Sequence, residues 1–155
     1  MRKAQDGDAE AIAAVTNRAY EVEKFFVDGD RTSAAEVRRL QETGWFLIED
    51  AHGGQLAASI YVRAGGGRGY FGLLAVDPAL QGRGLGRRMI TAAEAMCREL
   101  GCTAMDLRVV NLRSELPPFY RSLGYAECGT EPFPEGEVTR LPCHFIRMSK
   151  SLAPD

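Results

Sequence analysis

The feature that most constrains the fold is an apolar segment that runs through a glycine-rich turn into a helix. The sequence LLAVDPALQGRGLGRRMI, residues 73–90, begins as an apolar strand and then carries three alternating glycines. Helical spacing follows over residues 87–100, and a strand pattern follows over 104–110. Together with the strand predicted at 69–77, this order predicts a strand–helix–strand crossover, in which the two strands are parallel.

The rest of the chain alternates between helical and strand patterns. Apolar residues recur at helical spacing over 8–26, and Ser33 is placed to cap a second helix that ends near Thr43. Turn signals separate the strands that precede the crossover, which are predicted at 45–50 and 55–64. After the crossover come a short helix over 118–123, with Pro117 and Pro118 in its first turn, and final strands at 125–129 and 143–150.

Length and composition limit the function classes. The 155 residues are enough for a single domain, predicted here over 1–155, and the formal net charge of -2 provides no basic field for nucleic acid or anionic membranes. No stretch approaches the ~20 apolar residues that span a bilayer, so we expect a soluble, cytoplasmic protein with neither nucleic-acid nor membrane partners. The four cysteines lack CxxC spacing and there are two histidines, so we predict no metal site, no disulfides, and buried reduced thiols.

The glycine turn predicts an anion site. A helix N-terminus presents backbone N–H groups and the positive end of the helix dipole, and glycines allow close approach of a ligand. Arg87 and Arg88 lie where positive side chains oppose the dipole, which favours an anion that offsets them, although a plain tight turn with solvated arginines is the alternative. The dinucleotide fingerprint fails because its third glycine falls on Arg87, and the chain has no P-loop.

The spacing that does fit identifies a family. Gln81-x-x-Gly84-x-Gly86, preceded by Val-x-Pro, resembles the pyrophosphate-binding segment of the GCN5-related N-acetyltransferase (GNAT) superfamily. The segments AMDLRVVNLRSELPPFYRSLGY and MRKAQDGDAEAIAAV resemble the later and the first parts of the same fold. The resemblance implies a single α/β domain. Its central twisted sheet is mixed and mostly antiparallel, with one parallel pair joined by a βαβ crossover and helices on both faces.

The resemblance also implies site residues and a cosubstrate, acetyl-coenzyme A (acetyl-CoA), with no metal. Tyr120 matches the family tyrosine that protonates the departing thiolate, and its alternative role is a packed tyrosine beside Phe119. Asn111 matches an asparagine near the cofactor arm, with turn or helix capping as its alternative role. The residues expected to bind the cofactor are Leu74, Ala75, Val76, Gln81, Gly82, Arg83, Gly84, Leu85, Gly86, Arg87 and Asn111.

One departure from the family concerns the general base. Many relatives carry a glutamate on the strand before Val-x-Pro, whereas this chain has YFGLL at 70–74. The base is therefore unassigned, with Glu21, Glu23, Glu131 and His144 as candidates.

The leading hypothesis is an N-acetyltransferase that transfers acetyl directly to a primary amine of a small molecule or peptide. A non-catalytic acyl-CoA sensor on the same fold is the first alternative, and another phosphate-binding α/β domain is the second. A homodimer is compatible with the resemblance. Acidic residues in two loops are expected either to favour a cationic acceptor or to be plain solvated charges: Asp28, Asp30, Glu131, Glu135 and Glu137.

Overall fold

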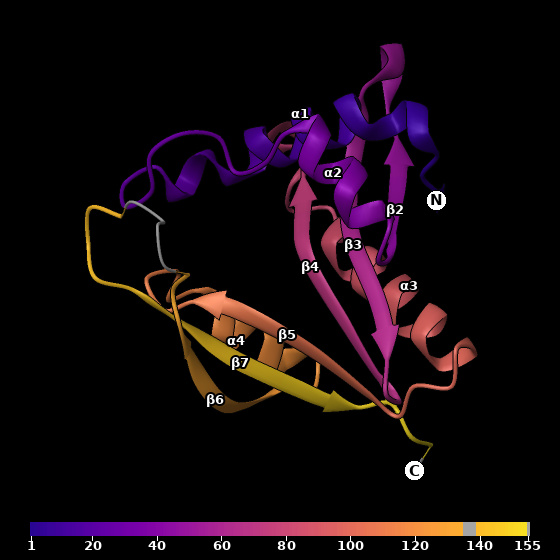
Figure 1. Ribbon diagram of the computed structural model, residues 1–155, viewed down its shortest axis with the longest axis vertical. Coiled ribbons are helices and arrows are strands. Elements are labelled where there is room, and N and C mark those ends of the chain that lie inside the picture. Colours follow the sequence, from indigo (N-terminus) through magenta and orange to yellow (C-terminus); the bar gives the residue numbers. More distant parts are fainter. Residues whose placement is uncertain (135–138, 155) are drawn as a thin grey trace.

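The computed structural model describes residues 1–134 and 139–154, whose strands form one seven-stranded sheet (Figure 1). The sheet order is β1-β2-β3-β4-β5-β7-β6, and β4–β5 is the parallel pair among antiparallel neighbours. The strands are β1 (Arg2–Lys3), β2 (Trp45–Asp50), β3 (Leu56–Gly65), β4 (Arg68–Val76), β5 (Ala104–Val110), β6 (Ala126–Pro132) and β7 (His144–Ser151). The predicted mixed α/β fold and its parallel crossover pair are thus confirmed.

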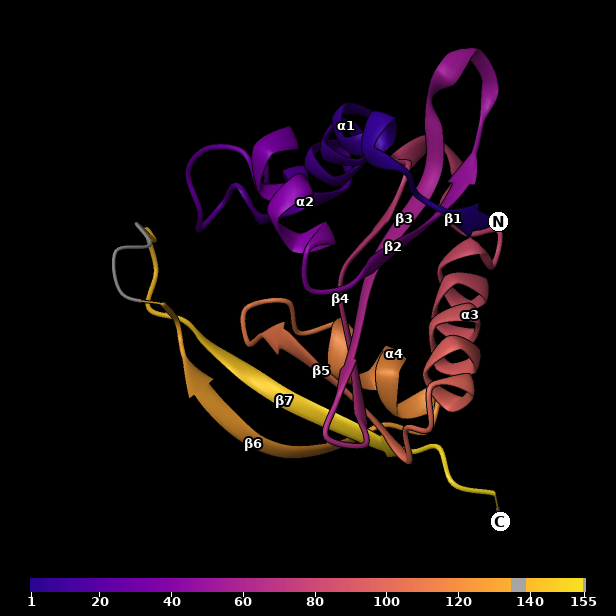
Figure 2. The same cartoon turned by 45° about the vertical axis from the view of Figure 1, so that its right-hand side comes forward.

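Helices cover both faces of the sheet (Figure 2). On one face, α1 and α2 pack against β2, β3 and β4 around Ile12 and Phe46. On the other face, α3 and α4 pack against β3, β4, β5 and β7 around Met89 and Met105. The helices are α1 (Ala9–Ala19), α2 (Ala34–Gln41), α3 (Leu85–Glu99) and α4 (Leu116–Ser122), with short 3₁₀ turns η1 (Asp6–Asp8), η2 (Tyr20–Glu23), η3 (His52–Gly54) and η4 (Pro78–Leu80).

The strands β4 and β5 pair over a short length and then separate. Residues 68–70 of β4 pair with 104–106 of β5, and no further pairing between these two strands follows. In Figure 1 the strands meet near the C-terminus and diverge away from it. Gly69 is needed at this junction because a Cβ there would lie 2.5 Å from the Cys97 sulfur of α3. The short pairing therefore sets the angle at which the sheet opens.

Several local predictions are confirmed and a few need correction. Ser33 caps α2 by accepting a hydrogen bond from the Glu36 amide. The helix predicted over 8–26 ends at Ala19 and continues as the tighter turn η2, which leaves Val22 and Phe25 exposed while Phe26 stays buried. The expectation of buried thiols is wrong for Cys128, which is exposed, and for Cys143, which is half-buried. Among the described residues, no helix combines the length and apolar character that a membrane crossing requires.

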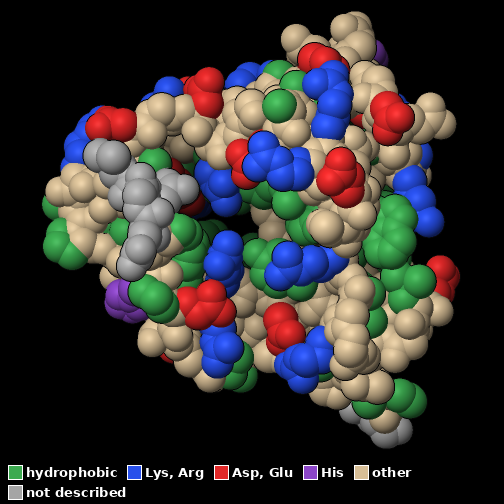
Figure 3. Space-filling view, in the orientation of Figure 1, with side chains coloured by type: hydrophobic (Ala, Val, Ile, Leu, Met, Phe, Trp, Pro, Cys, Tyr) green, Lys and Arg blue, Asp and Glu red, His purple; other side chains and the backbone are tan. Residues whose placement is uncertain are grey.

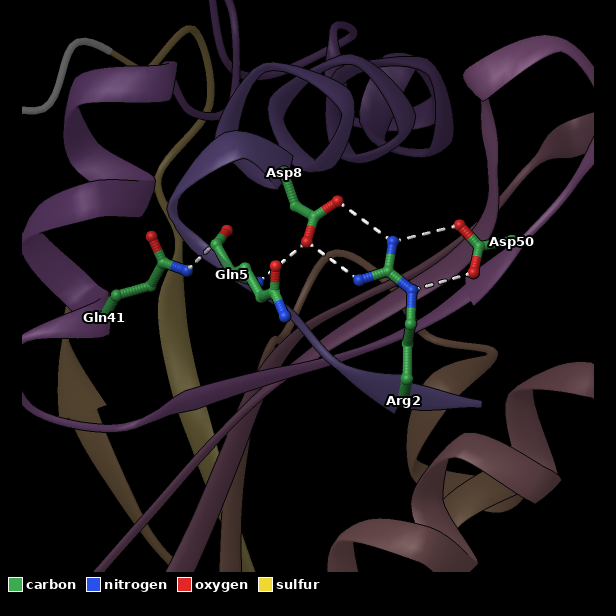
Figure 4. A network of polar contacts seen from close by, with 5 residues as sticks. All are labelled: Arg2, Gln5, Asp8, Gln41 and Asp50. Carbon is green, nitrogen blue, oxygen red and sulfur yellow. Dashed lines mark hydrogen bonds and ion pairs between the residues drawn. The ribbon is translucent and has the colours of Figure 1, made fainter.

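A polar network fixes the N-terminal strand (Figure 4). The Arg2 guanidinium bridges two carboxylates, with Nη1 2.9 Å from Asp8 Oδ2 and Nε 2.9 Å from Asp50 Oδ2. Asp8 also accepts a hydrogen bond from the Gln5 amide, and the Gln5 carbonyl accepts one from Gln41 of α2. Hydrogen bonding to Arg2 holds the pKa of Asp8 and Asp50 below the ordinary value. The network thereby joins β1, β2 and the start of α1.

We expect Asp8→Asn to lower the melting temperature by about 2–4 °C at pH 7, because the change weakens a bidentate but largely exposed ion pair. Since the folded-state pKa of Asp8 is depressed, its stabilisation is present above about pH 4 and is lost as the pH falls through that folded-state pKa. The gap between the wild type and the variant should therefore close on acidification in calorimetry. Asp6→Asn, at an exposed neighbouring position, is the control, and equal melting temperatures for both variants would contradict this role.

Candidate functional site

The divergence of β4 and β5 opens a cleft of about 1010 Å³. Its walls come from η2, the loop before α2, β4, the start of α3, the end of β5, and α4. Figure 3 shows a hollow between the helical layer above and the lower strands, with Lys and Arg side chains on its rim. One deep site therefore collects residues from nearly the whole chain.

The glycine turn forms one end of this cleft. Gly82 and Gly84 have φ values of 81° and 77°, a left-handed conformation that residues with a side chain rarely adopt. The first hydrogen bond of α3 runs from the Arg88 amide to the Gly84 carbonyl, at 3.2 Å. The amides of Leu85, Gly86 and Arg87 consequently lack partners within the helix. Such a set of N–H groups at a helix N-terminus fits a phosphate group.

The arginines that follow this turn lie as predicted in the first turn of α3. Arg87 also reaches across the cleft, where its guanidinium lies 5.5 Å from the ring centroid of Phe119 in α4. An anion at the turn would offset the unfavourable placement of Arg87 and Arg88 at the positive end of the helix dipole.

Along one wall, β4 presents backbone groups that no strand satisfies. Pairing with β5 stops after Tyr70, and a bulge opposite Ile60 puts Leu73 at φ 51°. The β5-facing backbone groups of residues 72–75 therefore have no strand partner and are available to a ligand. The Gln81 side chain donates to the Val76 carbonyl at 3.3 Å and links the strand to the glycine turn.

Tyr120 extends from α4 into the cleft wall. Its ring lies within about 6 Å of the rings of Phe71, Phe119 and Tyr125, and 6% of the residue is exposed. Burial raises the pKa of Tyr120 above the ordinary value, so the phenol stays protonated and able to donate. Tyr125 instead donates a 2.7 Å hydrogen bond to Glu94 in the core.

Among the four candidate bases, Glu23 alone lines the cleft. It is 9% exposed, and burial raises the pKa of this carboxyl group although Arg113 lies 2.9 Å away and opposes the shift. Glu21 is exposed and pairs with Lys24, and Glu131 lies on β6 between two arginines. His144 is exposed at the start of β7.

The structure brings most of the predicted site residues together. Those that line the cleft are Leu74, Val76, Gln81, Gly82, Gly84, Leu85, Gly86, Arg87 and Tyr120. Ala75 is buried in the sheet, and Arg83 is exposed on the turn outside the cleft lining. Asn111 also lies outside it: its Oδ1 accepts a hydrogen bond from the His144 amide at 2.8 Å, which joins the end of β5 to the start of β7.

The loop charges are largely neutralised. Asp28 pairs with Arg140, while Glu131 lies 3.4 Å from Arg108 and 3.8 Å from Arg147. Glu135 and Glu137 fall outside the described residues. A backbone bridge between Val27 and Thr139 also joins the two loops at the wide end of the cleft. Asp30 is exposed, lines the cleft and has no ion pair with another described residue, so this loop keeps one free negative charge there.

Sequence reasoning missed further cleft residues, among them Tyr20, Arg63, Tyr70, Arg108 and Arg113. Arg113 and Glu23 are 90 positions apart, so no local pattern links them. Only the sheet register brings Arg63 of β3 beside Tyr70 of β4.

Comparisons with known proteins agree on one family. The sequence profile described as the acetyltransferase (GNAT) family matches residues 10–125. Mycothiol acetyltransferase of Propionibacterium freudenreichii subsp. shermanii is 26% identical over 136 residues, which cover 82% of this chain and 43% of that protein. The Oryza sativa subsp. japonica protein named "Probable glucosamine 6-phosphate N-acetyltransferase 2" is 29% identical over 98 residues, 63% of this chain and 52% of that one. The chain spans about half the length of these relatives.

Solved structures share the fold at low sequence identity. The ribosomal-protein-S18-alanine N-acetyltransferase from Escherichia coli matches with a TM-score of 0.80 and 19% identity, over 99% of this chain and 94% of that one. The protein yncA from Salmonella typhimurium, solved with its cofactor acetyl-CoA, matches with a TM-score of 0.72 and 22% identity, over 99% and 96%. These likenesses establish the fold.

We expect Gly84→Ala to lower the melting temperature by roughly 2–8 °C, because a side chain at a left-handed position costs about 1–2 kcal/mol. Gly86→Ala is the matched change two residues later. Its φ is not in the left-handed region, and a Cβ there would meet only Val76 at 3.8 Å. Gly86→Ala should therefore leave the melting temperature unchanged or raise it slightly, and the reverse order in thermal unfolding would contradict the turn geometry.

Proposed function

Because this chain belongs to the acetyltransferase (GNAT) family, as the match over residues 10–125 shows, we propose that it transfers acetyl from acetyl-CoA directly to a primary amine of a small molecule or peptide. The observation that carries the proposal is the shared cleft. It combines the free amides of the α3 N-terminus, the unpaired edge of β4 and the buried phenol of Tyr120.

The residues that line the cleft fit acetyl-CoA as the cosubstrate. The amides of residues 85–87 would hold its pyrophosphate, and the backbone of residues 74–76 would accept its pantetheine arm much as a sheet edge accepts a peptide. Acetyl-CoA supplies the activated acetyl group as a thioester. No cysteine lines the cleft in the described part of the chain, which favours direct transfer over a covalent enzyme intermediate.

The chain's own groups then position and polarise the reactants. An N–H of the β4 bulge, near Leu74, stabilises the negative charge that develops on the carbonyl oxygen. The Tyr120 phenol donates its proton to the leaving sulfur. Burial raises the pKa of the Tyr120 phenol. The same desolvation disfavours the charged thiolate that leaves, so the pKa values of donor and acceptor shift in the same direction and the buried phenol remains a usable acid.

Glu23 serves as the base that removes the ammonium proton of the acceptor through water. It is the candidate that lines the cleft, and its ion pair with Arg113 fixes the carboxylate in place. Glu23 thus takes the role of the glutamate that many relatives carry on the strand before Val-x-Pro and that this chain lacks there.

Tyr120→Phe is expected to lower the rate of acetyl transfer by about 100-fold, because it removes the general acid while keeping the ring. Thiol release from acetyl-CoA across pooled primary amines measures the effect, and calorimetry should show unchanged coenzyme A binding. Tyr125→Phe is the matched control: it loses the hydrogen bond to Glu94 and some stability, but should keep the transfer rate.

The outcomes of this experiment separate the hypotheses. Acceptor-dependent release that is equal in wild type and Tyr120→Phe would remove Tyr120 from the chemistry. Coenzyme A binding without release from any amine would overturn the transferase and support the sensor.

Glu23→Gln is expected to lower kcat by about 100-fold or more, because it removes the base but keeps the shape of the side chain. Glu21→Gln, at an exposed position two residues earlier, should have no effect. Steady-state kinetics of both variants, measured with the amine that the wild type acetylates fastest, tests Glu23 as the base. A wild-type kcat for Glu23→Gln would contradict the assignment.

A further inference from the structure

A second hollow of about 600 Å³ joins the cleft at its floor. It lies on the outer face of β5 and β7, opposite the face that α3 and α4 cover. Met105 and Leu107 of β5 point into the core around α3, so by strand alternation Asp106 and Arg108 point to this outer face. In Figures 1 and 2, α1 and α2 do not extend over this part of the sheet.

The hollow carries an excess of positive charge. Four arginines line it, Arg63, Arg68, Arg108 and Arg147, against the two carboxylates of Asp106 and Glu131. Arg68 is fully matched, because it binds Asp106 through two hydrogen bonds of 2.8 and 2.7 Å. Arg108 and Arg147 share Glu131 through long contacts of 3.4 and 3.8 Å. In Figure 3, basic and acidic side chains alternate on the surface beneath the hollow.

Two of these arginines line both the cleft and the second hollow, and both are held in place by aromatic rings. Arg63 lies 4.3 Å from the ring centroid of Tyr70, and Arg108 lies 4.3 Å from that of Phe145. Arg63 has no carboxylate partner among the described residues. A stacked guanidinium keeps its planar donors free and oriented, which suits a carboxylate or a phosphate.

We propose that the acceptor is an amine carrying a carboxylate or phosphate, bound by Arg63 and Arg108, about 10 Å from its reactive nitrogen. The separation follows from β4: the bulge at Leu73 lies three residue steps after Tyr70, which is stacked with Arg63, and a strand rises about 3.3 Å per residue. The inference rests on the proposed acetyl transfer and narrows its substrate class. It also disfavours a cationic acceptor, one of the two interpretations of the acidic loops, because Asp28 and Glu131 are paired with arginines.

The test compares four acceptors of one chain length: octylamine, ω-amino-octanoate, ω-amino-octyl phosphate and diamino-octane. With the wild type, an anionic acceptor should have a KM about 10-fold or more below that of octylamine, as expected for a charge-assisted hydrogen bond. The better of the two anionic compounds identifies carboxylate or phosphate as the group recognised. Arg63→Gln and Arg108→Gln should each remove most of this preference while changing kcat and the KM for octylamine by less than about twofold. Arg39→Gln, on the exposed side of α2, is the control.

A binding measurement keeps this inference separate from the proposed transferase function. In the presence of coenzyme A, the anionic acceptors should raise the melting temperature of the wild type and not that of Arg63→Gln. Acetylation with equal or better KM for octylamine or diamino-octane would overturn the anionic acceptor and leave the transferase intact. Binding that depends on Arg63 without acetylation would overturn the transferase and support the anion site. Neither binding nor acetylation of any anionic probe would overturn the inference.

Discussion

The short parallel contact between β4 and β5 is the constraint on which the rest of the site depends. Three residues of β4 pair with three residues of β5. Arg68 of β4 donates hydrogen bonds to Asp106 of β5 across this junction, and Gly69 allows α3 to pack closely against it. Beyond this point the strands separate, and the backbone groups that a continuous sheet would use internally face a cleft instead. Unpaired strand edges are usually covered or blunted in proteins, so leaving one open inside the molecule is consistent with a ligand that covers it.

Elements that are distant in the sequence each contribute functional groups to this opening. The glycine turn supplies free amides, α4 supplies a buried phenol, and η2 supplies Glu23, which the loop before α4 holds through Arg113. Within the cleft Glu23 pairs with Arg113 and Asp28 with Arg140, whereas the floor beneath it carries an arginine excess. The cleft thus combines an end suited to a phosphate, a desolvated middle and an electropositive floor.

Sequence patterns predicted the architecture well where local forces decide it. The parallel crossover, the capped helix at Ser33 and the prolines in the first turn of α4 all follow from short-range rules on periodicity, capping and backbone donors. The helix predicted over 8–26 is too long because apolar residues continue past Ala19, whereas the chain there turns into η2 and leaves Val22 exposed. Cys128 illustrates the same limit, since its residue type favours burial but its position on β6 leaves it exposed.

The sequence alone was enough to predict the glycine turn, the strand before it and the helix after it, because glycine conformation and hydrophobic periodicity act over a few residues. It also singled out Tyr120 through a family resemblance. The glutamate that lines the cleft and the position of the unpaired arginines could be identified only from the tertiary structure. Arg113 meets Glu23 across 90 positions, and Arg63 comes beside Arg108 through the order of the sheet. Electrostatic pairing depends on distance in space, and sheet register sets that distance.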